Sequence, residues 1–189
     1  KSIRPTSNRA RQALFNRLEH SFKDYGFHLR GARVADLFAG TGALGLEALS
    51  RGAAHIVFVE TSLASRRLLH DNIAALDVSD KTAVLTLDAT SLPTASQAYD
   101  LVLLDPPYGE GLAQNTVDAL AAKEWLSDKS LIVTETAKDE TPTAPGGWAV
   151  EDTRAYGRGA ITYLVRSGPS NLPHTYDALL TDVANRISD

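Results

Sequence analysis

Short runs rich in apolar residues recur along the chain, and several end at an acidic residue. They lie at residues 32–37, 55–59, 83–87, 101–104 and 130–135. Apolar runs of this length are typical of strands covered on both faces in a parallel sheet. We therefore expect five parallel strands.

Helices are predicted between these strands. In the first and third, apolar side chains recur every three or four residues, which places them on one helical face. The predicted helices are residues 8–22, 43–51, 63–76 and 112–122. Thr6, Ser7 or Asn8 can cap the first one. We expect strand and helix to alternate five times.

The carboxyl-terminal part of the chain predicts a β-hairpin. Residues 148–156 and 160–166 have the pattern of two strands joined at Gly157-Arg158-Gly159. With the alternation, this predicts a three-layer αβα fold of the α/β class: a doubly wound, mostly parallel seven-stranded sheet with one antiparallel edge strand. The first and fourth strands would flank the point where the strand order reverses, which is where such sheets bind ligands.

The strand at residues 101–104 runs directly into Asp105-Pro106-Pro107-Tyr108, which we call the clamp. The strand must end there, because the prolines have no N–H for the sheet and hold the residues before them in extended geometry. Asp105 and Tyr108 are thus held at the carboxyl end of a central strand. A plain strand-ending turn, with a solvated Asp and a packed Tyr, is the alternative.

The clamp suits a planar group that carries an NH2, such as a nucleobase amine or a glutamine amide. Asp105 and the carbonyl of Pro106 accept hydrogen bonds, and the ring of Tyr108 can stack on a flat group. Accepting hydrogen bonds from both N–H groups of the amine draws the nitrogen toward tetrahedral geometry and frees its lone pair for attack.

A glycine-rich turn at residues 38–42, here called the glycine turn, follows the first strand. Gly40 and Gly42 let the backbone turn tightly and lie close to a ligand. With Gly45 the spacing is also Gly-x-Gly-x-x-Gly, so a dinucleotide site is an alternative. Asp36 argues against it, because a carboxylate would repel a pyrophosphate but would bind the ammonium of S-adenosylmethionine, which has no phosphate.

Two further strands end at acidic residues. Glu60 follows residues 55–59, and its two oxygens match the vicinal hydroxyls of a ribose. Both nucleoside cofactors need that contact, so Glu60 does not discriminate between them. Asp88, next to Ala89, can accept a hydrogen bond from an adenine amine; a helix cap is the alternative.

The charge is unevenly distributed. Residues 1–33 carry +6 and the whole chain −4, which leaves −10 for the remainder. A basic segment on an acidic body is typical of a localised contact with a polyanion such as nucleic acid; a solvated helix face is the alternative. Arg9 and Arg11 lie off the apolar stripe of the first helix, so they are left for solvent or phosphate.

Length and composition exclude several classes of protein. The 189 residues suit one domain, and the absence of cysteine excludes disulfides and thiolate chemistry. With no membrane-length apolar run and no signal peptide, we expect a cytoplasmic protein. The chain lacks methionine and begins at Lys1, so we expect residues ahead of Lys1; loss of modified methionines from the sequence is a second hypothesis.

As a set, these motifs resemble a known family. Asp36-x-Phe38-Ala39-Gly40-x-Gly42, Glu60, Asp88 and the clamp are similar to Rossmann-like class I S-adenosylmethionine-dependent methyltransferases that act on amines. More narrowly, the chain resembles the RsmD family in these segments: Arg4-Pro5-Thr6 with Arg9 and Arg11, residues 36–52, Asn72-Ile73, Trp125-Leu126 and Tyr156-Gly157. That family methylates the exocyclic amine of one guanine in bacterial 16S ribosomal RNA.

The resemblance implies a catalytic clamp, a cofactor site and an RNA contact. The implied catalytic residues are Asp105, Pro106, Pro107 and Tyr108. The implied site for S-adenosylmethionine, and for its product S-adenosylhomocysteine, comprises Asp36, Phe38, Ala39, Gly40, Thr41, Gly42, Glu60, Asp88 and Ala89. The implied contact with 16S ribosomal RNA, in an assembling or assembled small ribosomal subunit, comprises Arg4, Pro5, Thr6, Arg9 and Arg11. No metal is needed, because the sulfonium supplies the reactivity.

We expect three parts: a basic segment at residues 1–31, a methyltransferase domain at 32–166 and an appendage at 167–189 with a short amphipathic helix. Two other enzymes would use the same clamp, an adenine-N6 DNA methyltransferase and a protein glutamine methyltransferase, although the latter family usually has Asn where Asp105 stands. A nucleic-acid-binding module with a vestigial cofactor fold would need a broken glycine turn or clamp, and both are intact.

Overall fold

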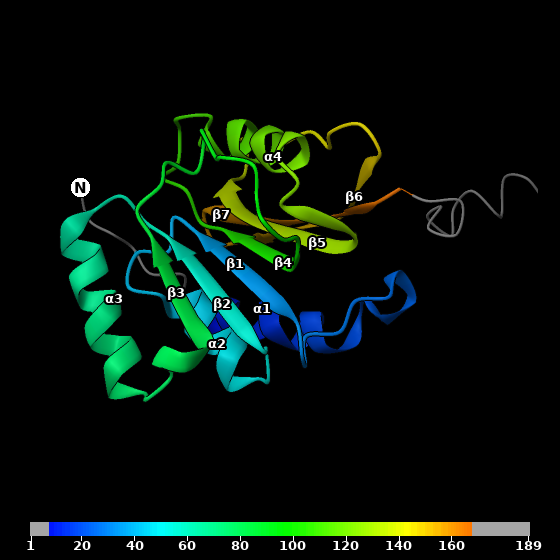
Figure 1. The fold of residues 1–189 in the computed structure, drawn as a ribbon. Coiled ribbons are helices and arrows are strands. Elements are labelled where there is room, and N and C mark those ends of the chain that lie inside the picture. Colours follow the sequence, from blue (N-terminus) through cyan, green and yellow to red (C-terminus); the bar gives the residue numbers. More distant parts are fainter. Residues whose placement is uncertain (1–7, 168–189) are drawn as a thin grey trace, which may run out of the picture.

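The computed structural model describes residues 8–167, which form a seven-stranded sheet with helices on both faces (Figure 1). The strands are β1 Arg33–Leu37, β2 His55–Val59, β3 Thr82–Leu85, β4 Tyr99–Leu104, β5 Leu126–Ala137, β6 Trp148–Tyr156 and β7 Gly159–Arg166. The helices are α1 Asn8–His20, α2 Ala43–Ser50, α3 Leu63–Ala75 and α4 Leu112–Ala122, with short 3-10 helices η1 Lys23–Tyr25 and η2 Ser79–Lys81. These elements confirm the predicted runs, with ends that differ by a few residues.

The strand order is β3-β2-β1-β4-β5-β7-β6. Strands β1 to β5 pair in parallel, and β7 runs antiparallel between β5 and the edge strand β6. The doubly wound sheet with an antiparallel strand at one edge is therefore confirmed, with β7 one place in from the end. The order reverses between β1 and β4, as predicted.

The sheet is covered on both faces, which confirms three layers. Helices α1, α2 and α3 share one apolar core with the sheet, and α4 shares the other; Figure 1 shows α4 on one side of the sheet and α1 and α2 on the opposite side. Neighbouring residues on a strand point to opposite faces. In β4, Leu101 and Leu103 therefore enter the first core, while Val102 and Leu104 enter the second.

The connection from β3 to β4 contains no helix, so the prediction of five strand and helix alternations is wrong. Residues 86–98 form turns and bends. Asp88 accepts a hydrogen bond from the backbone N–H of Thr90, and such local bonds compete with helix formation, as does Pro93. Ala89 and Leu92 nevertheless bury their side chains in the α4-side core, so this loop covers the sheet where a helix was expected.

The apolar stripe predicted for α1 is confirmed. Ala10, Leu14, Leu18 and Phe22 are buried, although Phe22 lies just beyond the last helical residue. These side chains pack in the same core as the sheet, apart from Ala10. The boundary predicted at residue 31 stays a prediction, and the helix predicted in the appendage lies outside the described residues.

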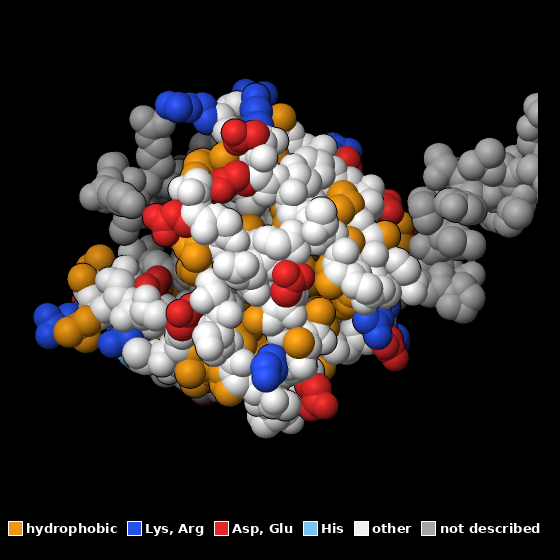
Figure 2. All heavy atoms as spheres, turned by 90° about the horizontal axis from the view of Figure 1, so that it is seen from above, with side chains coloured by type: hydrophobic (Ala, Val, Ile, Leu, Met, Phe, Trp, Pro, Cys, Tyr) orange, Lys and Arg blue, Asp and Glu red, His pale blue; other side chains and the backbone are white. Residues whose placement is uncertain are grey.

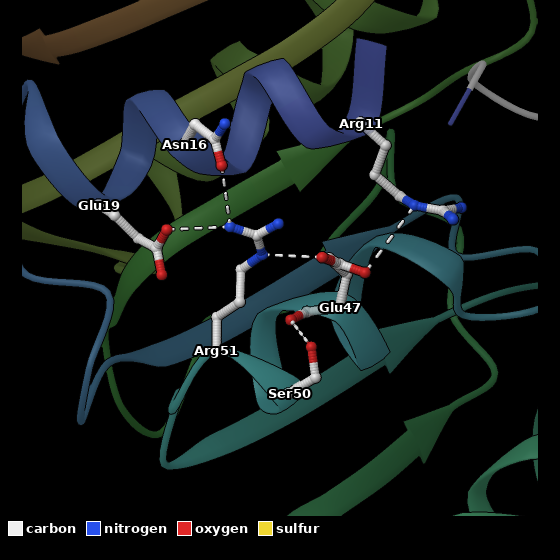
Figure 3. A network of polar contacts seen from close by, with 6 residues as sticks. All are labelled: Arg11, Asn16, Glu19, Glu47, Ser50 and Arg51. Carbon is white, nitrogen blue, oxygen red and sulfur yellow. Dashed lines mark hydrogen bonds and ion pairs between the residues drawn. The ribbon is translucent and has the colours of Figure 1, made fainter. Parts of the chain in front are cut away.

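An ion-pair network fastens α1 to α2 (Figure 3). Arg51, which follows α2, donates to Glu19 and Asn16 of α1 at 2.9 and 3.3 Å. It also donates to Glu47 of α2 at 2.7 Å, and Nε of Arg11 lies 4.0 Å from the same carboxylate. The basic helix is thereby tied to the helix that starts at the glycine turn.

Candidate active site

The glycine turn and the clamp leave the sheet at the same edge. β1 and β4 pair in parallel, with Leu37 opposite Leu104. The first strand continues into the glycine turn and the fourth into Asp105, so the two segments start side by side. This confirms the predicted juxtaposition at the point where the strand order reverses.

Asp36 supports the glycine turn from within the protein. Its side chain is only 1% exposed, and its Oδ2 accepts a hydrogen bond of 2.8 Å from the N–H of Gly45 in the first turn of α2. Burial raises the pKa of Asp36 to about 8; the Gly45 N–H opposes that shift, and the negative charges of Asp105 and Glu60 add to it. The carboxyl thus caps α2.

The three glycines of this segment have different roles. Gly40 has a φ of 55°, and a Cβ added there would meet no atom within 4 Å, so open space lies beside this residue. At Gly42 a Cβ would collide with Leu69 of α3, and at Gly45 it would collide with Phe58 of β2. Only Gly40 therefore leaves room for a ligand, whereas the other two permit close packing of helices.

The rest of the turn is held by hydrogen bonds to its backbone groups. Phe38 adopts a positive φ of 60°, which is rare for a residue with a side chain. The N–H of Ala39 donates to the carbonyl of Val59 at 3.1 Å, and the carbonyl of Thr41 accepts from Asn72 of α3 at 3.0 Å. The turn is thus fixed against the neighbouring strand and helix.

Glu60 links β2 to the glycine turn. Its two carboxylate oxygens accept from the N–H of Gly40 at 2.8 Å and of Ser62 at 2.7 Å. Asp88 lies exposed after β3, and its Oδ1 accepts from the hydroxyl and the N–H of Thr90, which lowers the pKa of Asp88. Both acids carry remaining lone pairs that a ligand can use.

A pocket of about 250 Å³ joins these strand ends. Its lining residues are Phe38, Val59, Glu60, Thr61, Leu87, Asp88, Ala89, Thr90 and Leu112. Acidic acceptors stand beside apolar walls, a combination that suits a nucleoside with hydroxyls, an amine and a flat ring. We call this cavity the nucleoside pocket.

The clamp is partly open to solvent. Pro106 is buried, Asp105 is half-buried, Pro107 is exposed, and Tyr108 is 44% exposed. The hydroxyl of Tyr108 donates to Oε1 of Glu135 at 2.8 Å. Burial, followed by this contact with Glu135, raises the pKa of Tyr108, so the phenol stays protonated at neutral pH.

A second pocket of about 170 Å³ lies against the clamp, and we call it the clamp pocket. Its lining residues are Pro106, Pro107, Tyr108, Gly111, Leu112, Ala113, Gln114, Thr136, Glu140, Thr141 and Pro142. Leu112, at the start of α4, lines both pockets. The two cavities are therefore neighbours.

Sequence reasoning missed Glu135 and Glu140. Glu135 lies near the end of β5 and binds Tyr108, while Glu140 follows that strand and accepts from the N–H of Gly109 at 2.8 Å. The rule that drew attention to Asp36, Glu60 and Asp88, an acid at the end of a parallel strand, also applies to Glu135. No local signal marks Glu140, which reaches the clamp across a turn region.

The predicted RNA contact is only partly visible. Arg4, Pro5 and Thr6 lie outside the described residues. Arg9 is exposed on α1, whereas Arg11 pairs with Glu47 rather than extending freely into solvent. Its position at the start of the basic helix still leaves it at the surface.

Residues 8–167 contain neither a cluster of metal ligands nor a membrane-spanning helix. Within this part of the chain, no three His, Asp or Glu side chains gather as a metal site would require. None of its helices combines the length and apolar character needed to span a membrane.

Comparison with known proteins gives a consistent set of relatives. The family model described as Conserved hypothetical protein 95 matches residues 1–165. Ribosomal RNA small subunit methyltransferase D of Escherichia coli K12 is 35% identical over 159 residues, which cover 84% of this chain and 77% of that protein. The protein of the same name from Haemophilus influenzae is 33% identical over 152 residues, covering 78% and 75%.

Solved structures agree with these relatives. The Escherichia coli protein yhhF has a TM-score of 0.75 at 31% identity, covering 88% of this chain and 91% of its own. Ribosomal protein L11 methylase of Lactobacillus delbrueckii has a TM-score of 0.68 at 16% identity, covering 86% and 81%, which shows the Rossmann-like methyltransferase fold alone. On the family model and the curated relatives together, the chain belongs to the RsmD family, that of ribosomal RNA small subunit methyltransferase D.

Proposed function

We propose that this chain is an S-adenosylmethionine-dependent methyltransferase that methylates the exocyclic N2 amine of a guanine in 16S ribosomal RNA. The observation that carries the proposal is the parallel pairing of β1 with β4, which brings the glycine turn and the clamp to one edge. The names of the curated relatives support ribosomal RNA of the small subunit as the substrate.

The nucleoside pocket fits S-adenosylmethionine. Glu60 offers acceptors for the ribose hydroxyls and Asp88 one for the adenine amine, while Phe38 and Leu87 supply apolar walls. The open space at Gly40 leaves room for the rest of the cofactor. An ammonium near Asp36 would favour the ionised form of this buried carboxyl.

The chain's own residues act by positioning. When bound, S-adenosylmethionine supplies a methyl group, and the new N–C bond forms as the C–S bond breaks. Asp105 and the carbonyl of Pro106 accept hydrogen bonds from the two N–H groups of the amine and leave its lone pair directed outward. The proton that the nitrogen loses after methylation passes to solvent through the half-buried carboxylate of Asp105. Tyr108 fixes the plane of the base by stacking, and its exposure lets a flipped-out base reach it. Flipping costs a few kcal/mol, which this stacking offsets in part.

The basic segment at residues 1–31 would hold the RNA. Figure 2 shows acidic side chains across the face that α4 covers, with Lys and Arg mostly at its rim. An acidic body repels phosphate, so the backbone contacts fall to the segment where positive charge gathers. Arg9 and Arg11 of α1 belong to this segment. In the proposed division of the chain, the methyltransferase domain at residues 32–166 follows it, and the appendage at residues 167–189 comes last.

Transfer of a labelled methyl group tests the proposal. The protein is incubated with labelled S-adenosylmethionine and, separately, 16S ribosomal RNA, small ribosomal subunits, DNA or protein. We expect label in 16S RNA or in the subunit, released as N2-methylguanosine after digestion to nucleosides. Label on DNA adenine or on protein glutamine would support the rival enzymes that share the clamp, and no transfer to any substrate would support a binding module.

A further inference from the structure

The clamp pocket has the size of a site for one base rather than for a whole nucleotide. Its volume of about 170 Å³ lies below the roughly 300–1,000 Å³ typical of small-molecule pockets. It is bounded by the clamp, the first turn of α4, the end of β5 and the turn region after β5. A base whose amine lies in the clamp would extend into this cavity.

Glu140 supplies a hydrogen-bond acceptor in the clamp pocket. Among the described residues that line it, Glu140 is the one with a charged side chain. Both of its oxygens accept from the N–H of Gly109 at 2.8 Å, which fixes the carboxylate beside the end of the clamp. Each oxygen keeps a further lone pair for a ligand.

Thr136 also lines this pocket and carries a buried donor. It is only 2% exposed, and its hydroxyl has no hydrogen-bond partner within the described chain. A buried polar group without a partner is costly, so a ligand atom that accepts from it would be favoured. Gln114, which also lines the pocket, is already bonded to Thr143 through both ends of its amide.

These two side chains match guanine among the bases. Along its Watson–Crick edge guanine presents the N2 amine, then the N1–H donor, then the O6 acceptor. Adenine and cytosine instead carry a ring nitrogen with a lone pair beside the amine, and a carboxylate at that place would repel this lone pair. The clamp accepts from an amine, the carboxylate accepts from an N–H group, and the hydroxyl donates to an oxygen. Among the bases, guanine alone offers all three partners in this order.

We propose that the clamp pocket selects guanine, with Glu140 accepting from N1–H and the hydroxyl of Thr136 donating to O6 while the clamp holds N2. The inference rests on the proposed function and adds the residues that select the base. Glu140 and Thr136 are specificity-determining residues in this account, and Asp105 remains the residue at the reacting amine.

The test compares guanine with 2-aminopurine at the methylated position of the RNA substrate, once that position is mapped. 2-Aminopurine keeps the amine but lacks both N1–H and O6. The native chain should favour guanine by at least about tenfold in kcat/KM, because a polar site rejects a base that leaves its groups unpaired. Glu140→Gln and Thr136→Val should each lower this ratio severalfold, mainly by slowing transfer to guanine.

Two matched controls separate selection from general damage. Thr134 lies on the same face of β5 and its buried hydroxyl also lacks a partner in the described chain, yet it does not line the pocket. Thr134→Val and Asp139→Asn should therefore keep the native ratio. Thr136→Val breaks no hydrogen bond, so its melting temperature should not fall, and it stands as the test if Glu140→Gln is inactive.

The outcomes distinguish the two proposals. If the native chain methylates guanine and both Glu140→Gln and Thr136→Val retain the native ratio, the selection mechanism is overturned and the proposed function stands. If the native chain methylates no guanine although S-adenosylhomocysteine binds it, the proposed function fails and the selection mechanism fails with it.

Discussion

Leu37 at the end of β1 lies directly opposite Leu104 at the end of β4 in a parallel pair. One strand leads into the glycine turn and the other into Asp105, and the connections after them depart to opposite faces of the sheet. A nucleoside cofactor and an amine can therefore be held next to each other without either covering the other.

Replacing Asp105 with Ala should reduce methyl transfer by at least about a hundredfold, the usual cost of losing one well-placed polar group at a reacting centre. Affinity for S-adenosylhomocysteine, measured by calorimetry, should stay within about twofold, since Asp105 does not line the nucleoside pocket. Asp128→Ala, at an exposed position near the start of β5, is the control. Normal turnover by Asp105→Ala would refute the assignment of the clamp.

Replacing Glu60 with Ala should weaken binding of S-adenosylhomocysteine by at least about tenfold. The change removes the ribose acceptor and also the two bonds that hold the N–H groups of Gly40 and Ser62. Asp71→Ala, an exposed acid on α3, removes the same charge outside the pocket. An unchanged dissociation constant in Glu60→Ala would place the cofactor elsewhere.

Asp36 should make the stability of the chain fall as pH rises. Its pKa is about 8 in the folded state against 3.8 without burial, so between these values the folded state holds more protons than the unfolded state. The free energy of unfolding then decreases with pH, by at most about 1.4 kcal/mol per unit from this group.

Asp36→Asn removes that titration and keeps an acceptor for the N–H of Gly45. Relative to the native chain, the variant should therefore gain stability between pH 5 and pH 8, measured by urea unfolding at both values. A difference between the two proteins that is the same at pH 5 and pH 8 would show that Asp36 does not titrate in this window.

Replacing Arg9 and Arg11 with Ala should weaken RNA binding and flatten its dependence on salt, by up to about two in the slope of log K against log salt concentration. The contact of Arg11 with Glu47 implies the smaller share for Arg11. Lys129→Ala, near the amino end of β5 and thus away from the clamp edge, is the control. A slope equal to that of the native chain would mean that these arginines do not contact phosphate.

The local sequence pattern was sufficient to predict the strands and the edge of the sheet where the site lies. An apolar run that leads into Asp105-Pro106 or into the glycine turn marks both a buried strand and its end, so the edge that carries the site followed from the strands. The count of five alternations failed at residues 86–98, where no helical pattern had been identified and where Asp88, Thr90 and Pro93 favour turns.

Long-range side-chain contacts were beyond the local pattern. Glu140 reaches Gly109 across 31 residues, and Glu47 draws Arg11 toward α2 across 36. Such contacts depend on how β5 and α2 pack, which periodicity does not encode. The burial of Asp36 was missed for the same reason, since a strand end looks exposed until the turn and α2 cover it.

The most direct test of the central claim is a structure of the protein with S-adenosylhomocysteine bound. We expect the adenosine in the nucleoside pocket and the sulfur facing the Asp105 carboxylate across the ends of β1 and β4, with no side chain between them. A sulfur that faces away from the clamp, or a cofactor bound at the opposite edge of the sheet, would contradict the account.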